Sequence, residues 1–139
     1  MSKRDVTAFE GPAMAWHKGL DEAGLTLDDL SLVETHDCFT IAELIQYEAM
    51  GLTDAGKGMQ ALEEGTVYKD GKLPVNPSGG LKAKGHPVGA TGVSMHVMAA
   101  RQLMDDAGEM QVKDAKLAGI FNMGGAAVAN YLSILERVK

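Results

Sequence analysis

The feature that most constrains the fold of this sequence is the order in which helix-like and strand-like segments follow one another. Apolar residues at helical spacing alternate along the chain with short apolar runs, which are typical of buried strands. The expected helices are Gly11–Ala23, Thr40–Met50 and Ala90–Met104, and the expected strands are Leu30–Thr35, Leu73–Val75 and Leu117–Met123. This alternation predicts parallel strand pairing with helices on both faces of the sheet.

The end of the sequence departs from this alternation. Gly124-Gly125 interrupts the apolar pattern, and a further strand is expected over Ala126–Leu135. The link is too short for a crossover helix, so the last two strands must form an antiparallel hairpin. We therefore predict an α/β fold with a mixed, mostly parallel sheet. Residues 1–10 are expected to be a polar stub, with a stub of strand at Val6–Phe9, and residues 11–139 one domain.

Composition excludes several classes of function. A net charge of −6 without a basic run argues against nucleic acid and anionic membranes as partners. The single cysteine excludes an internal disulfide and a cysteine zinc cluster. Neither a signal peptide nor a long apolar run is recognisable, so we expect a soluble cytoplasmic protein.

The stretch Asn76–Arg101 contains the first candidate for chemistry. Two runs rich in glycine and proline precede the helix Ala90–Met104 and hold His86 on a stiff loop at the helix entrance. Pro87 biases His86 toward an extended backbone, and the neighbouring glycines leave room for a ligand. A turn that merely contains a histidine explains the same residues equally well.

Cys38 is the second candidate, because it lies between the end of a strand and the start of a helix. Backbone N–H groups and the helix dipole favour a thiolate there, so a lowered thiol pKa is expected. With His36 two residues before it and His86 on the other loop, Cys38 could serve in nucleophilic or acid–base chemistry. The alternatives are a small buried apolar role for Cys38 and a strand-end cap formed by His36-Asp37. The histidine spacing is not diagnostic of a metal site, and we expect none.

The helix Ala90–Met104 has large apolar side chains around most of its circumference. Val93, Met95, Val97 and Leu103 lie on divergent faces, which predicts burial on several sides. A domain of this size offers no second layer for that helix. We therefore expect another chain to pack on it, either a second copy in a homo-oligomer or a different partner.

Three motifs together resemble the C-terminal half of the thiolase superfamily, in its sterol-carrier-protein-type branch. They are His36-Asp37-Cys38-Phe39, the NPSGG and GHPVGATG block over Asn76–Gly92, and Asn122-Met123-Gly124-Gly125. The resemblance runs from about Gly11 to Glu136. It implies one half of a five-layer sandwich, with Ala90–Met104 in the buried middle layer.

The resemblance also implies a reaction and roles. The chain resembles acetyl-CoA acetyltransferase-type enzymes, which use a coenzyme A thioester as substrate and no separate cofactor. His86 would activate a nucleophilic cysteine and help bind an oxyanion, and His36 would hold a water or donate to a second oxyanion. Cys38 would move the α-proton of the acyl group. The residues implied to contact substrate are Gly85, Pro87, Asn122 and Gly124.

The chain departs from the family pattern in ways that limit this expectation. No second cysteine is present, so the nucleophile would have to come from an N-terminal half, in cis or as a separate chain. Asn122 stands where many members have a Cys-x-Gly loop. The family's half also begins with a strand expected at the centre of the sheet, for which only Val6–Phe9 remains. A thiolase-like retro-aldolase and a non-catalytic acyl-CoA-binding or scaffolding subunit are therefore kept as alternatives.

Overall fold

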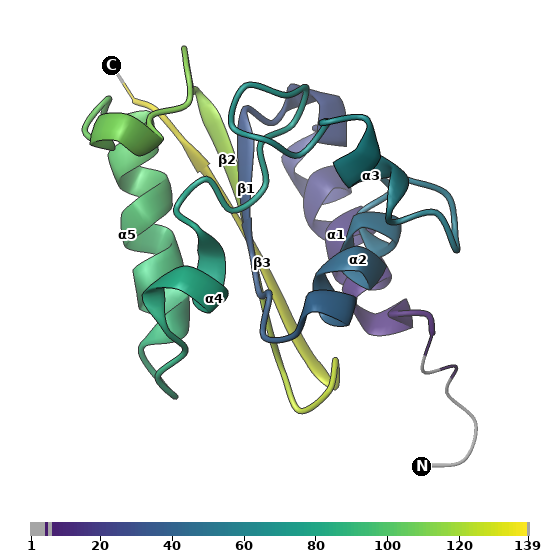
Figure 1. Cartoon of the computed structure of the whole chain (residues 1–139). Coiled ribbons are helices and arrows are strands. Elements are labelled where there is room, and N and C mark those ends of the chain that lie inside the picture. The colour runs from purple at the N-terminus through teal and green to yellow at the C-terminus, as the bar shows by residue number, and fades with distance from the viewer. Residues whose placement is uncertain (1–4, 6, 139) are drawn as a thin grey trace.

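The computed structural model describes residue 5 and residues 7–138 of the chain. One strand lies between the first two α-helices, only helices follow it until the last quarter of the chain, and two strands end the chain (Figure 1). The elements, in chain order, are α1 (Glu10–Ala23), η1 (Leu27–Asp29), β1 (Leu32–Thr35), α2 (Thr40–Ala49), α3 (Gln60–Glu63), α4 (Gly80–Lys84), α5 (Thr91–Leu103), η2 (Gly108–Met110), β2 (Leu117–Gly124) and β3 (Ala129–Glu136).

The sheet is mixed and has the order β1-β2-β3. β1 runs parallel to β2, and β2 pairs with β3 as an antiparallel hairpin, which confirms the predicted fold class. The expected strand Leu73–Val75 is reduced to one parallel bridge between Val33 and Val75.

The expectation of a missing central strand is wrong. β2 occupies the centre and pairs directly with β1, from Leu32 with Ala118 to Thr35 with Phe121, so no strand can enter between them. Thr7–Phe9 do not form a strand, and Val6 lies outside the described residues.

Helices cover both faces of the sheet, α1 and α2 on one side and α4 and α5 on the other (Figure 1). Adjacent residues of β1 therefore belong to different hydrophobic clusters. Val33 is in the cluster that contains Trp16, and Leu32 is in the cluster that contains Met95. All four residues of β1 are buried, the polar Glu34 and Thr35 included. The Trp16 ring stacks on Phe121 of β2 at a centroid distance of 5.8 Å.

One face of α5 packs on the sheet and another is open. Met95, Ala99 and Leu103 are buried, whereas Val97 and Met104 are 51% and 64% exposed. The helix that the sequence predicted to be buried on several sides is thus covered on one side by the described residues.

Two local differences from the sequence prediction lie near the edge of the sheet. The short helix α4 forms where only a turn was expected, and β3 begins at Ala129 rather than Ala126. The turn between β2 and β3 holds Ala126 and Ala127 at φ values of 53° and 65°, which extended strand residues do not adopt. No helix in the described part of the chain is long and apolar enough to cross a membrane.

Candidate active site

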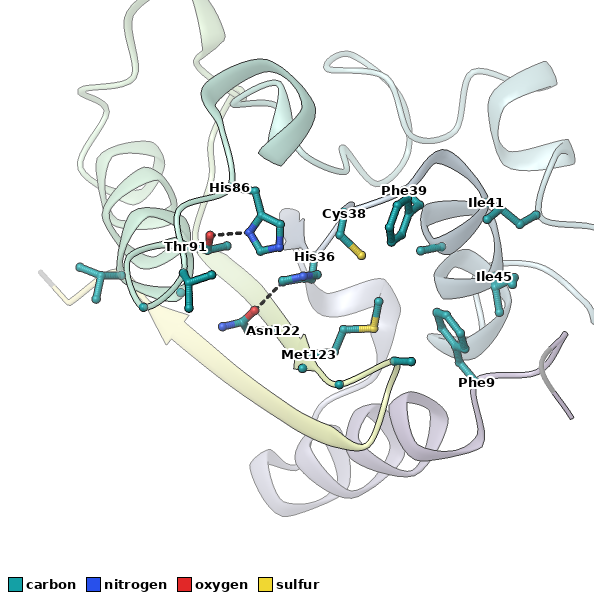
Figure 2. A pocket seen from close by; sticks show the side chains of 18 residues that line it. Phe9, His36, Cys38, Phe39, Ile41, Ile45, His86, Thr91, Asn122 and Met123 are labelled. Carbon is teal, nitrogen blue, oxygen red and sulfur yellow. Dashed lines mark hydrogen bonds between the residues drawn. The ribbon is translucent and has the colours of Figure 1, made fainter. Parts of the chain in front are cut away.

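Three segments that are distant in the sequence meet beyond the ends of β1 and β2. His36 and Cys38 follow β1, Asn122 lies near the end of β2, and His86 lies on the loop before α5. Because β1 and β2 are parallel, their carboxyl ends lie at the same edge of the sheet. The rings of His36 and His86 pack edge to face, with centroids 4.7 Å apart. Figure 2 shows Cys38 beside them, so the three predicted catalytic side chains lie together.

His86 is held in one tautomer by a short chain of hydrogen bonds. The hydroxyl of Thr91, the first residue of α5, donates to the carbonyl of Pro87 at 3.1 Å. That hydroxyl has one proton, so it accepts from Nδ1–H of His86 at 2.8 Å. Nε2 of His86 therefore carries a free lone pair and can act as a base. Sequence reasoning missed Thr91, although it lies within the motif that contains His86.

His36 is held through both its ring and its backbone. Its Nδ1–H donates to the side-chain oxygen of Asn122 at 2.6 Å. Its carbonyl accepts from Nε2 of the fully buried Gln46 on α2, also at 2.6 Å. Gln46 in turn accepts a hydrogen bond from the hydroxyl of Thr35. Gln46 was not singled out from the sequence, where it is one polar residue in an amphipathic helix.

The surroundings of His36 favour its neutral form. Burial lowers the pKa of His36, the hydrogen bond with Asn122 raises it to a smaller extent, and the nearby His86 lowers it further. Because a neutral imidazole that donates through Nδ1 carries a lone pair on Nε2, His36 can accept a hydrogen bond from a water.

The thiol pKa of Cys38 is raised, whereas the sequence predicted a lowered one. Burial raises the pKa of the thiol, and the backbone N–H groups of Cys38 and Phe39 lower it by less. The nearby carboxylate of Asp37 raises it further. Desolvation thus outweighs the helix-start position, and Cys38 is a protonated thiol at neutral pH that is suited to donate a proton.

Asp37, between His36 and Cys38, faces away from the cavity and joins two loops. Its fully buried carboxylate accepts the backbone N–H of Leu81 at 2.7 Å and lies 3.7 Å from Nζ of Lys82. This contact satisfies a free N–H group in the first turn of α4, which leads directly to Gly85-His86. Asp37 therefore sets the position of the His86 loop relative to His36 and Cys38.

The candidate catalytic residues line a cavity of about 930 Å³. Of the four residues that the resemblance implies to contact substrate, Asn122 and Gly124 are among its lining residues, whereas Gly85 and Pro87 are not. The remaining walls are mostly small or apolar and include Phe9, Phe39, Ile41, Ala42, Ile45, Val88, Val93 and Met123. Within the described part of the chain, none of the lining residues is charged. The same part contains no group of three histidine, cysteine or carboxylate side chains that could hold a metal ion.

Known proteins with similar sequences cover this chain almost completely. It is 40% identical over 135 residues to an acetyl-CoA acetyltransferase of Methanothermobacter thermautotrophicus, covering 97% of this chain and 35% of that protein. It is 42% identical over 124 residues to human sterol carrier protein 2, covering 88% of this chain and 23% of that protein. The chain is also 34% identical over 122 residues to the benzoylsuccinyl-CoA thiolase subunit BbsB of Thauera aromatica. This match covers 88% of this chain and 32% of that protein.

The fold has a counterpart among solved structures. The chain superposes on a structure titled Ltp2-ChsH2(DUF35) aldolase with a TM-score of 0.84 at 20% identity, covering 99% of this chain and 35% of that one. This chain thus spans about a third or less of the length of the proteins it matches.

A family model described as thiolase C-terminal domain-like matches residues 1–137. That match includes both loops that bring His36, Cys38 and His86 together, as well as the hairpin that carries Asn122. The fold, the motifs and the matches agree, and the chain belongs to the thiolase C-terminal domain family.

Proposed function

We propose that this chain is the C-terminal catalytic domain of a thiolase-like acyl-CoA acyltransferase, in which His36, Cys38 and His86 perform the acid–base chemistry. The convergence of these side chains on one uncharged cavity carries the proposal. The nucleophilic cysteine comes from an N-terminal half, in cis or on a separate chain, because Cys38 is the one cysteine in this sequence. A thiol that must remain reduced favours a cytoplasmic setting.

In the cleavage direction, Nε2 of His86 takes the proton of the nucleophilic cysteine, whose sulfur then bonds to the 3-keto carbon of the substrate. The bond between C2 and C3 breaks, its electron pair passes to C2, and C2 receives the proton of Cys38. Nε2 of His36 orients a water toward the enolate oxygen. The coenzyme A thiol then gives its proton to the Cys38 thiolate as its sulfur bonds to the acyl carbon. The bond from that carbon to the nucleophilic sulfur breaks, and this sulfur regains the proton held on Nε2 of His86. In condensation each step is reversed.

The raised pKa of Cys38 supports this division of roles. A thiol that keeps its proton at neutral pH is a poor resting nucleophile but a competent acid toward an enolate. His86 is exposed to the cavity with a free Nε2, so it is the better placed of the two histidines to accept a proton from an incoming thiol.

A retro-aldolase is the alternative that the single cysteine favours. Such a reaction uses the same acid–base groups and forms no acyl-enzyme, so it does not require a second sulfur. A non-catalytic acyl-CoA-binding or scaffolding subunit would need the cavity but none of the three catalytic side chains.

The test is thiolysis of acetoacetyl-CoA by this chain combined with a thiolase N-terminal half. We expect His86→Ala to lower kcat by about 100-fold or more, as the loss of a general base or oxyanion donor does. His17→Ala, which removes an exposed histidine on α1, is the matched control. Activity of His86→Ala within a few-fold of the parent, or thiolysis by this chain alone, would contradict the proposal. Cleavage of a β-hydroxy thioester without thiolysis would favour the aldolase.

The open face of α5 supports a partner as part of the proposal. Val97 on α5 and Met104, the residue that follows α5, are large apolar side chains that are more than half exposed, and exposed apolar surface of this kind favours a partner. We propose that the N-terminal half or a second copy of this chain covers that face. Light scattering at micromolar concentration would exclude the second copy if the chain alone remained a monomer, and failure of that monomer to bind the N-terminal half would refute the proposal.

A further inference from the structure

The loop that carries His86 has no buried side chain of its own. Residues 85–90 are all exposed. Gly85 and Gly89 have φ values of 92° and 82° with open space around both, so the chain can hinge at either side of His86. After the loop, the buried Thr91 accepts Nδ1–H of His86. The position of His86 therefore depends on how the chain is held at the two ends of this loop.

At the first end, Lys84 joins the loop to strand β1 through a buried ion pair. Nζ of Lys84 lies 3.3 Å from Oε2 of Glu34 and donates to the hydroxyl of Ser78 at 2.8 Å. That hydroxyl donates to the same carboxylate oxygen at 2.7 Å. The Glu34 side chain is fully buried and that of Lys84 is only 20% exposed, so solvent and salt screen this ion pair little.

The pair connects the two segments that carry the histidines. Glu34 lies two residues before His36, and Lys84 lies two residues before His86. Figure 2 shows the two rings facing one another, and their centroids are 4.7 Å apart. Asp37 holds the first turn of α4, whereas the Glu34–Lys84 pair holds its last residue. Without that pair, the hinge at position 85 would allow the His86 ring to move away from His36.

From these contacts we propose that Glu34 and Lys84 are positioning residues for the reaction, and that their ion pair sets the separation of the His36 and His86 rings. Neither side chain lines the cavity, so both act through the histidines. The inference rests on the proposed function, which assigns the chemistry to these rings. A catalytic group displaced by about 1 Å can lower the rate by about 100-fold, so a pair outside the cavity can control kcat.

NMR of the chain alone tests the geometry. Lys84→Met keeps an unbranched, helix-compatible side chain and removes the cation. The nuclear Overhauser effect between the His36 and His86 rings, expected in the parent from their 4.7 Å separation, should be lost. Burial and the nearby His86 both lower the pKa of His36, and both influences weaken when the loop moves away. The pKa of His36 should therefore rise toward its ordinary 6.5.

Thiolysis of acetoacetyl-CoA by the complete enzyme tests the consequence. Lys84→Met should lower kcat by about tenfold to 100-fold with KM nearly unchanged, since the loss concerns the reacting groups rather than substrate binding. Lys84→Arg keeps a cation able to reach Glu34 and should restore kcat to within about threefold of the parent.

A second variant guards against failure to fold. Lys84→Met leaves the Glu34 carboxylate buried without its cation, which destabilises the chain. The double variant Glu34→Gln with Lys84→Met removes both charges, and it should show the same loss of ring contact and kcat. If Lys84→Met does not fold, the double variant decides.

Two controls separate positioning from stability and from charge removal. Lys72→Met breaks an exposed ion pair with Asp28, in which Nζ and Oδ1 are 2.8 Å apart, and makes the same substitution elsewhere. Leu20→Ala removes apolar contacts between α1 and the opposite face of the sheet and so destabilises the fold away from the site. Both variants, measured while folded, should retain the ring contact, the pKa of His36 and kcat.

Parent-like kcat in a folded Lys84→Met or double variant would overturn the inference and leave the proposed function intact. A fall in kcat with an intact ring contact would also overturn it. So would loss of the ring contact in Leu20→Ala, because the effect would then follow from stability alone. Absence of thiolysis by the parent complete enzyme would refute the proposed function, while loss of the ring contact in Lys84→Met would still support the role of the pair in holding the two rings together.

Discussion

The contact between Asp37 and the start of α4 should control the stability of both loops that carry candidate catalytic residues, and Gly80→Ala tests it. Gly80 has a φ of 65°, and its backbone lies against the buried Asp37 carboxylate. A Cβ at position 80 would lie 2.6 Å from Cγ and 2.7 Å from Oδ1 of Asp37, closer than carbon and oxygen atoms can pack. The carboxylate or α4 must therefore move, and the hydrogen bond from Leu81 N–H must lengthen or break.

The expected loss in the free energy of unfolding on Gly80→Ala has two parts. An alanine in the left-handed region costs about 1–2 kcal/mol. Displacement of a buried carboxylate from its backbone donor costs about a further 1.5–3 kcal/mol, the range for hydrogen bonds to charged groups. Gly80→Ala should therefore lower the free energy of unfolding by about 2.5–5 kcal/mol. Gly24→Ala is the matched control, because Gly24 has a φ of 67° with open space around it and should cost only the first part.

Urea unfolding of a double-mutant cycle separates the two parts. In an Asp37→Ala background the carboxylate is gone, so Gly80→Ala should cost about the same as Gly24→Ala, that is about 1–2 kcal/mol. In NMR spectra, Gly80→Ala in the parent should also shift the ring signals of His36 and His86, whereas Gly24→Ala should not. Equal costs of Gly80→Ala in both backgrounds would refute the argument that Asp37 ties the loops together.

Three further predictions follow from the candidate site. Burial lowers the pKa of His36 below its ordinary 6.5, so the unfolded state binds more protons. The urea midpoint should therefore fall as pH drops below about 6.5, and His36→Asn should reduce that slope. Because the pKa of Cys38 is raised above 9.0, its iodoacetamide rate should reach half-maximum at a higher pH than that of free cysteine, and a lower midpoint would contradict this. Thr91→Val should lower kcat of the complete enzyme about threefold to tenfold by freeing the His86 ring, and Thr91→Ser should restore it.

Much of the fold could be predicted because it depends on local patterns. α1 ends at Ala23 because Gly24 adopts a left-handed conformation with a φ of 67°, as a glycine after a helical pattern predicts. The hairpin of β2 and β3 follows from a link too short for a crossover. The meeting of His36, Cys38 and His86 could be expected from the resemblance of their motifs, whereas the residues alone left a simple turn equally possible for His86.

The features that could not be predicted depend on contacts between distant residues. α4 is five residues long and forms because Asp37, more than forty positions earlier, accepts its first free N–H groups. The roles of Thr91 and Gln46 depend on which partners their side chains meet in space. The pKa of Cys38 was predicted in the wrong direction because the position at a helix start is visible in the sequence, while the extent of burial is not.

The same long-range contacts explain how a charged scaffold surrounds an uncharged cavity. Glu34 and Asp37 are fully buried at the end of β1, yet both face the segment that contains α4. Glu34 is paired with Lys84, and Asp37 lies within 3.7 Å of Lys82. Their charges therefore position the loops from outside the cavity. Burial and the neighbouring His86 lower the pKa of His36, and although the Asp37 carboxylate raises it, the net shift is downward. A carboxylate turned into the cavity would raise the pKa of His36 and favour its imidazolium form, which has no free lone pair on Nε2. This separation of charge therefore preserves the neutral His36 that the proposed reaction requires.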